Sequence, residues 1–438
     1  MDLAQSPALV RNAVDALDLA FSGDGAPAPF ADLRRDARQS FEALGLPTTR
    51  DEAWKYTDLR PALAPDYQIA DENAEVPADV LDGYAIDGLD AARVVIVNGR
   101  VRTELCDLSG LPEGVRVGSL REAAAADAAV LADYFGRYAD VSRDGFASLN
   151  ASFDLDGLFL LVPRGVAAER PIHVVHVVTA DTPAFVQSRH LIVVGEVAQA
   201  SVIETFHVLG EADSFRNELT EIVAGPQAHV EHVRVQDEGD TANGVSLVQA
   251  YQERNSTVET LTFTFASGTV RNNVVMVPDG EGCQSTLGGL YLCRGDQHVD
   301  TSTLVDHVAP GCQSNELFKG IVTDRSTGVF NGKVFVRREA QQTNAYQQSQ
   351  GVVLSPDAHH YSKPELEIYA DDVKCSHGST TGSVEPEHVF YLRSRGVSEA
   401  DARAMLLYAF AHDVVEMVSS EPLRDHLDAK IVERLAQS

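Results

Sequence analysis

The segment with the clearest potential for chemistry is Tyr369–Gly382, which contains Lys374, Cys375 and His377. On an extended strand, positions i and i+2 point to the same side, so Cys375 and His377 would present a thiol and an imidazole side by side. These groups suit iron, zinc or copper(I), and Lys374 would favour the thiolate form. Two ligands do not complete a four-coordinate site, so the others would come from a partner chain or from exogenous sulfide. Alternatively, Cys375 is a small buried apolar residue and His377 an ordinary strand histidine.

The remaining cysteines and the histidines follow no ligand pattern. The five cysteines are an odd number with wide spacing and no CxxC pair, so neither a disulfide framework nor a self-contained four-cysteine zinc site is expected. Four of them are interpreted as structural residues: Cys106, Cys283, Cys293 and Cys312. The sequence has no GxGxxG, HExxH or GxSxG motif, which excludes the usual nucleotide-binding, zinc-protease and serine-hydrolase sites. Any nucleotide energy that the protein uses must therefore be released by another chain.

The charge of the chain excludes two classes of partner. Its 438 residues include 35 Lys and Arg against 65 Asp and Glu, a formal net charge of -30. A general nucleic-acid surface needs basic patches, and an anionic membrane would repel this chain. The sequence contains no apolar run of the roughly 18 residues that a spanning helix needs, and its start lacks the pattern of a secretory signal. The expected location is the cytoplasm, where reduced thiols are usual.

The elements that must position Cys375 and His377 are β-strands. Between 156 and 385 the apolar runs are short and β-branched or aromatic, with Gly, Asn, Asp and Pro between them. Four similar tetrapeptides begin at 254, 283, 312 and 341, at intervals of 29 residues, and Met276, Val305 and Val334 repeat at the same interval. A fixed period with strands and no helix predicts a β-solenoid, in which equivalent positions stack on successive turns.

Helical patterns flank this region on both sides. Residues 1–155 form a mainly helical N-terminal region with a short strand segment, in which the only tryptophan, Trp54, is interpreted as a packing anchor. Residues 386–438 form a C-terminal helical region. An apolar stripe in this region is a candidate either for docking a partner or for capping the end of the solenoid: Leu407, Phe410, Val414 and Val418.

Five sequence blocks resemble one known family. They are Glu52–Thr57, Val97–Arg100, Asp156–Gly165 with Arg170–Ile172, Lys363–Gly378 and Phe390–Gly396. In these blocks the chain is similar to the SufB/SufD family of the SufBCD iron–sulfur cluster assembly complex, and more to its SufD members than to SufB. The block around Cys375 and His377 is the most specific of the five.

The resemblance has implications for fold and function. It implies a right-handed parallel β-helix flanked by N-terminal and C-terminal α-helical regions, which agrees with the repeat. It also implies a non-catalytic scaffold subunit that pairs with SufB and binds the ATPase SufC through its C-terminal helices. A transient iron–sulfur cluster would form at the SufB–SufD interface, with His377 and the neighbouring Cys375 as candidate ligands. No tightly bound cofactor is expected, and the isolated subunit would form a homodimer.

Two other functions are compatible with a β-solenoid. The first is a carbohydrate-active enzyme, since many solenoids cleave acidic polysaccharides. Such enzymes are usually exported, so the acidic charge and the missing signal pattern argue against this function. The second is a purely structural homodimer that pairs through the edge of the solenoid.

Overall fold

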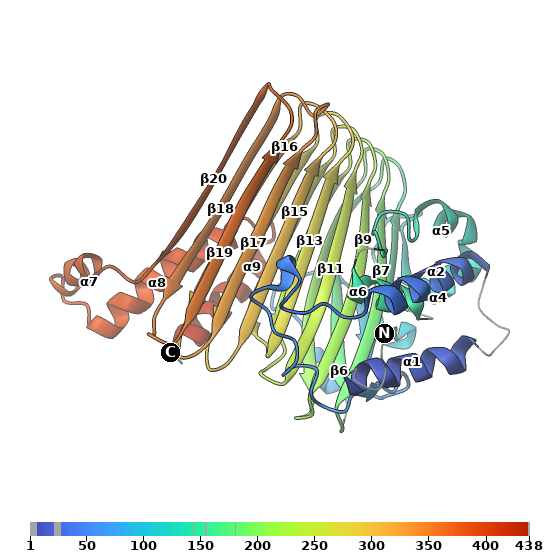
Figure 1. Cartoon of the computed structure of the whole chain (residues 1–438), viewed down its shortest axis with the longest axis horizontal. Helices are drawn as coiled ribbons and strands as arrows, with labels where there is room; N and C mark the ends of the chain where they lie inside the picture. The colour runs from blue at the N-terminus through green and yellow to red at the C-terminus, as the bar shows by residue number, and fades with distance from the viewer. Residues whose placement is uncertain (1–6, 22–27, 143, 154–155, 180, 437–438) are drawn as a thin grey trace.

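The computed structural model describes residues 7–21, 28–142, 144–153, 156–179 and 181–436 and is mainly β (Figure 1). Strands from β5 onward fall alternately into two long sheets, and each strand pairs in parallel with the strand two places along the chain. This arrangement is a parallel β-helix of about seven turns. The predicted fold class is therefore confirmed. We call the space enclosed between the inner faces of the two sheets the lumen.

Sheet A contains the odd-numbered strands of the solenoid and two N-terminal additions. Its strands are β1 (Gln68–Ile69), β4 (Arg116–Ser119), β5 (Leu158–Val162), β7 (Ala184–Val194), β9 (Ser214–Ala224), β11 (Ala242–Gln252), β13 (Thr269–Pro278), β15 (His298–His307), β17 (Thr327–Val336) and β19 (His359–Ile368). Strand β1 pairs with β7, and β4 is antiparallel to β5.

Sheet B contains the even-numbered strands and begins with a strand of the N-terminal region. Its strands are β2 (Ala92–Val97), β3 (Arg100–Val101), β6 (Ala167–Thr179), β8 (Gln199–Leu209), β10 (His229–Asp237), β12 (Thr257–Ala266), β14 (Gln284–Cys293), β16 (Gln313–Val322), β18 (Thr343–Val353) and β20 (Val373–Gly382). Strand β2 pairs in parallel with β6, so the N-terminal region supplies the first strand of this sheet.

The strand register confirms only part of the predicted repeat. Met276 pairs with Val305 and Val305 with Val334, so this column has the expected interval of 29 residues. Among the tetrapeptides, those that begin at 283 and 312 lie on neighbouring strands whose paired residues are separated by the expected interval. In the turn before them the paired residues are 27 residues apart, and in the turn after them 31. The turns between strands vary in length, whereas the positions that fill the lumen must stack.

The lumen combines an apolar core with buried charges. Its apolar side chains include Ile192, Ile222, Val274 and Val305, all fully or almost fully buried. Burying a side chain of this size contributes about 1.5–3 kcal/mol. The ion pairs of the lumen lie near its N-terminal end, on β6 to β10.

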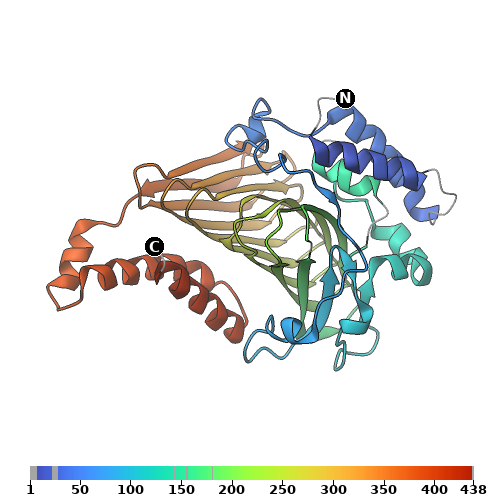
Figure 2. The same ribbon diagram turned by 90° about the horizontal axis from the view of Figure 1, so that it is seen from below.

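The helices of the N-terminal region pack on the outer face of sheet A (Figure 2). They are α1 (Ala8–Phe21), α2 (Ala28–Leu44), α4 (Leu120–Ala126), α5 (Ala128–Tyr134) and α6 (Gly145–Ser152); the region also contains α3 (Ala78–Asp82) and 3₁₀ turns at Glu52–Trp54 and Thr103–Leu105. Trp54 is buried, with its ring 4.1 Å from the Arg271 guanidinium and 5.8 Å from the Phe146 ring. The interpretation of Trp54 as a packing anchor is confirmed.

The C-terminal helices are α7 (Pro386–Arg393), α8 (Glu399–Val415) and α9 (Glu421–Ala436). Helices α8 and α9 pack on the outer face of sheet B, against apolar residues such as Leu261, Phe263 and Ile321. Leu407, Val414 and Val418 are buried in this contact, and the Phe410 ring lies 4.5 Å from Lys319 Nζ. The stripe therefore covers a face of the solenoid, and the expectation that it caps the terminal turn is wrong. Among the described residues, no helix is both long and apolar enough to cross a membrane.

Candidate functional site

The two candidate ligands lie on β20, the last strand of sheet B. Cys375 pairs with Ala345 and His377 with Gln347, both on β18. Among the strands that the structure describes, β18 is the only neighbour of β20, so the other edge of β20 is open (Figure 1). The backbone groups along such an edge are free to pair with another chain.

Cys375 and His377 share the lumen side of this strand. Cys375 packs against a buried cluster that includes Val334 and Ala345 and is itself partly buried, while His377, two residues further on, is exposed. Because Ala345 and Gln347 beneath them are buried lumen residues, both candidates lie at the open end of the lumen. A thiol and an imidazole are thus adjacent at an edge where a second chain could add further ligands.

The expected effect of Lys374 on the thiol is wrong. Burial raises the pKa of Cys375, and the Ala345 backbone opposes this only in part. Lys374 lies on the opposite side of the strand because successive side chains alternate. A cation or a partner chain must therefore displace the proton before Cys375 can act as a thiolate ligand.

A groove runs beside His377. Its volume is about 550 Å³, and it is lined by residues of β16, β18 and β20 and by Met417, which follows α8. His377 and Ser376 belong to its lining, as does the exposed ring of Tyr346. The edge of β20 is therefore bordered by open surface on its outer side.

The other cysteines have structural surroundings. Cys283, Cys293 and Cys312 are buried, and Cys106 is partly buried. The thiols of Cys283 and Cys312 both donate to the Gly280 carbonyl oxygen, at 3.1 and 3.2 Å. None of these four lies on β20, and Cys375 remains the cysteine at the open edge.

A buried group with the composition of a metal site is better described as part of an ion-pair network. Candidate ligand atoms of His176, His190 and Glu218 lie within 4.8 Å of one another. His190 Nδ1 already accepts the Leu158 backbone N–H at 2.8 Å, so its proton is on Nε2, which faces Glu218 Oε1 at 3.0 Å. With both nitrogens engaged, this imidazole has no lone pair for a metal ion.

Two arginines balance the charge of Glu218. Arg216 Nη1 and Arg234 Nη2 lie 2.5 and 2.8 Å from Glu218 Oε2. Burial alone would raise the pKa of Glu218, but the attraction of the two guanidiniums outweighs it and holds this pKa below its usual value. Glu204 has a similar environment, because it accepts hydrogen bonds from His176 at 3.0 Å and His232 at 2.6 Å.

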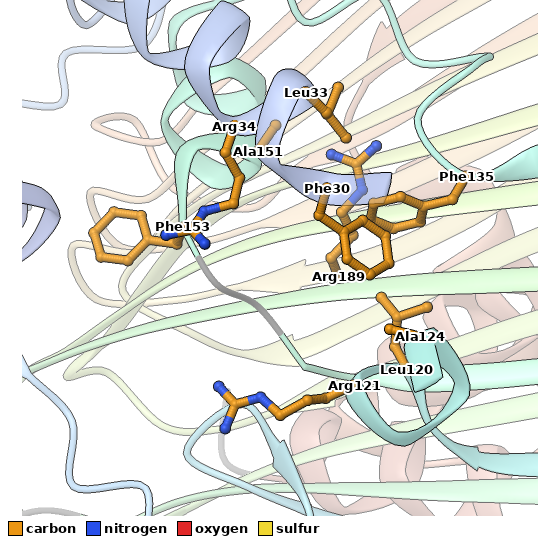
Figure 3. A pocket seen from close by; sticks show the side chains of 10 residues that line it. All are labelled: Phe30, Leu33, Arg34, Leu120, Arg121, Ala124, Phe135, Ala151, Phe153 and Arg189. Carbon is orange, nitrogen blue, oxygen red and sulfur yellow. The ribbon is translucent and has the colours of Figure 1, made fainter. Parts of the chain in front are cut away.

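A separate pocket lies under the N-terminal helices (Figure 3). Phe30 and Phe135 meet edge to face at 4.5 Å, and the guanidinium of Arg189 lies 4.7 Å from the Phe135 ring. Arg189 is fully buried and pairs with Glu221 at 2.8 Å. This pocket belongs to the packing of α2, α4 and α5 on sheet A and lies far along the solenoid from β20 (Figure 1).

Inspection of the sequence did not identify Glu316, a carboxyl in the lumen two turns below His377. Thr303 Oγ1 donates to it at 2.6 Å and Gln347 Nε2 at 3.1 Å. Burial raises the pKa of Glu316 to about 7, and these two hydrogen bonds only partly oppose the shift. No local motif marks this residue, because its partners come from other strands.

The Glu316→Gln variant should remove a pH-dependent loss of stability. The folded chain holds the Glu316 proton up to about pH 7, whereas the unfolded chain releases it near pH 4.5, so stability falls as the pH rises between these values. The shift corresponds to about 3 kcal/mol. We expect the wild type and the variant to have similar free energies of unfolding at pH 4 and the variant to be more stable at pH 8, in urea titrations. Equal pH profiles would contradict this environment for Glu316.

Fold and site together define a class: a β-solenoid subunit with a thiol and an imidazole at an open terminal edge. A model described as "SUF system FeS cluster assembly, SufBD core domain" matches residues 176–410, and one for the SufBD N-terminal region matches residues 21–174. The chain therefore belongs to the SufBD family. The description of the core-domain model names iron–sulfur cluster assembly, not polysaccharide cleavage.

Relatives match along most of this chain. A SufBD family protein of Synechocystis is 32% identical over 404 residues, covering 90% of this chain and 88% of that protein. The iron–sulfur cluster assembly protein SufD of Escherichia coli is 30% identical over 405 residues, covering 91% and 92%. The chloroplastic protein ABCI7 of Arabidopsis thaliana is 27% identical over 410 residues, covering 91% and 84%.

Proposed function

We propose that this chain is a non-catalytic scaffold subunit of a cytoplasmic SufBCD complex, in which it pairs with SufB and with the ATPase SufC. The iron–sulfur cluster is its cargo, assembled transiently at the SufB–SufD interface with His377 and Cys375 among the ligands. The main observation in favour is the position of these two residues on β20, whose outer edge is open in the part of the chain that the structure describes.

The terminal turn is suited to pairing with SufB. Strands β19 and β20 each pair on one side within the described residues, so their free edges can continue into the strands of a second solenoid. A partner joined in this way would lie directly over Cys375 and His377. In the absence of SufB, a second copy of this chain could occupy the same edge, which accounts for the proposed homodimer.

The surface proposed for SufC differs from the stripe expected from the sequence. Leu407, Val414 and Val418 are buried against sheet B, so they support the position of α8. Three exposed apolar side chains of this region lie instead on α7 and the first half of α8: Phe390 (73% exposed), Tyr391 (56%) and Met405 (53%). A fourth, Val432 (56% exposed), lies apart from them on α9. We place the SufC contact on the three exposed residues of α7 and α8.

Mixing this chain with SufB and SufC should yield a hetero-complex, measured by light scattering after gel filtration. The Phe390→Asp variant should bind SufC at least about tenfold more weakly, because a charge would replace an anchor of the contact. Val432→Asp is a matched control, since Val432 is also exposed but lies on α9. If the chain forms a homodimer and binds neither SufB nor SufC, the scaffold function is refuted. Unchanged SufC affinity of the Phe390 variant would refute only the docking surface.

A further inference from the structure

Glu316 differs from the other carboxylates of the lumen. Glu204 and Glu218 each contact histidine or arginine side chains within 3.0 Å. Glu316 is equally buried, but the described residues provide it with only a hydroxyl and an amide. A buried carboxylate with no positive partner is costly when ionised, so a cation from solution would be stabilised here.

The neighbouring side chains supply further oxygen atoms. Gln347 and Ser349 on β18 are almost fully buried, and within the described part of the chain Gln347 Oε1 and Ser349 Oγ have no hydrogen-bond partner. Both lie on the lumen side, and Gln347 pairs in register with Glu316. A buried amide oxygen without a hydrogen-bond partner, next to a carboxyl without a positively charged partner, indicates a missing ligand.

The distances fit a small divalent cation. The Gln347 amide lies 3.1 Å from Glu316 Oε1, and a half-turn of the amide would place its oxygen there, since O and N occupy equivalent positions. Two oxygens about 3 Å apart form one edge of an octahedron with metal–oxygen distances of about 2.1 Å. The Thr303 hydroxyl, 2.6 Å from the other carboxylate oxygen, can complete a third position.

Glycine at position 332 leaves space for this arrangement. A Cβ atom on Gly332 would lie 2.4 Å from Gln347 Nε2, so any larger residue would push the amide away from Glu316. The lumen is also open nearby, because the next residue above Gln347 is the exposed His377 at the terminal edge. A cation has a short route from solution to Glu316.

We propose that Glu316, Gln347 and Thr303 form a divalent-cation site in the lumen, in which Gln347 lies one turn and Glu316 two turns beneath the edge that carries Cys375 and His377. An all-oxygen set suits hard cations such as Mg²⁺ or Mn²⁺, and also Fe²⁺, better than copper(I), which prefers sulfur ligands. Its identification as a holding site for ferrous iron rests on the proposed function. The site itself does not depend on the partners, because all three ligands belong to this chain.

Manganese is a suitable probe, because the electron paramagnetic resonance signal of free Mn²⁺ decreases when the ion is bound. The full-length chain should bind one equivalent of Mn²⁺ in about 0.5 M NaCl, which screens the exposed carboxylates. Glu316→Gln should weaken this binding at least about tenfold, and Fe²⁺ added without oxygen should compete for the site. Glu113→Gln, which removes an exposed carboxylate, should leave binding unchanged.

Two further variants separate the site from its alternatives. Gln347→Leu keeps the side-chain bulk and removes the amide oxygen, so it should weaken binding even if Glu316→Gln does not fold. His377→Ala should retain Mn²⁺ within about twofold; a loss equal to that of Glu316→Gln would place the ion at the edge and overturn the site. Absence of wild-type binding, or full binding by Glu316→Gln, would also overturn it. If Mn²⁺ binds here but the SufBCD complex builds no cluster, the proposed function fails and the cation site remains.

Discussion

A SufBCD complex that carries His377→Ala is expected to assemble normally and to build at least about tenfold less iron–sulfur cluster than the wild type. His377 is exposed on the terminal strand, so its side chain contributes little to folding. Its imidazole would supply a ligand that alanine cannot replace, whereas the backbone of β20 can still pair with a partner. Anaerobic reconstitution followed by iron and sulfide quantification measures the expected loss.

The neighbouring serine provides a matched control. Ser376 lies on the same strand and is exposed, but its side chain is on the opposite side from Cys375 and His377. Ser376→Ala should therefore leave the cluster yield unchanged, while Cys375→Ser should lower it. A normal yield from His377→Ala, in a complex of the correct mass, would show that His377 is not a cluster ligand.

The Glu218→Gln variant is expected to lower the free energy of unfolding by about 3–5 kcal/mol. Glu218 is fully buried between Arg216 and Arg234, and a neutral amide in its place would leave two guanidiniums with less compensation in the lumen. The remaining carboxylates offset only part of this cost: Glu238 lies 2.7 Å from Arg216, and Glu204 is 4.0 Å from Arg234. The large effect follows from the low dielectric constant of the interior.

Urea titration followed by circular dichroism measures this loss, and hydrogen exchange locates it. Because each solenoid turn contacts mainly its neighbours, exchange should accelerate most in β9 and β10. Glu387→Gln, an exposed carboxylate on α7, should change the stability by less than about 0.5 kcal/mol. A change as small as this for Glu218→Gln would mean that the buried network contributes little to stability.

The sequence predicted the β-helix because lumen residues must repeat. Met276, Val305 and Val334 keep one interval, since each fills the same position in successive turns. The polar tetrapeptides begin beside the turns, where residues can be added or removed without disturbing the stack. Their apparent period therefore matched the true register at only one of three steps.

Local sequence was less informative about which surfaces are exposed. The stripe of Leu407, Val414 and Val418 predicted an apolar helix face, and this face exists. Periodicity cannot distinguish a face that packs on its own chain from one that binds a partner, because both are apolar. Only the tertiary structure showed that the stripe packs on sheet B and that Phe390, on α7, is exposed.

The sequence by itself determined the fold class, the family resemblance and the shared side of Cys375 and His377. Strand alternation and the repeat can be recognised in the order of the residues alone, without knowledge of tertiary contacts. The tertiary structure decided that this pair lies at an open edge. It also brought Glu316 to Thr303 and Gln347, which lie 13 and 31 residues away along the chain. Coiling stacks residues from separate turns within hydrogen-bonding distance, and the burial that shifts the pKa of Glu316 exists only after those turns have closed around it.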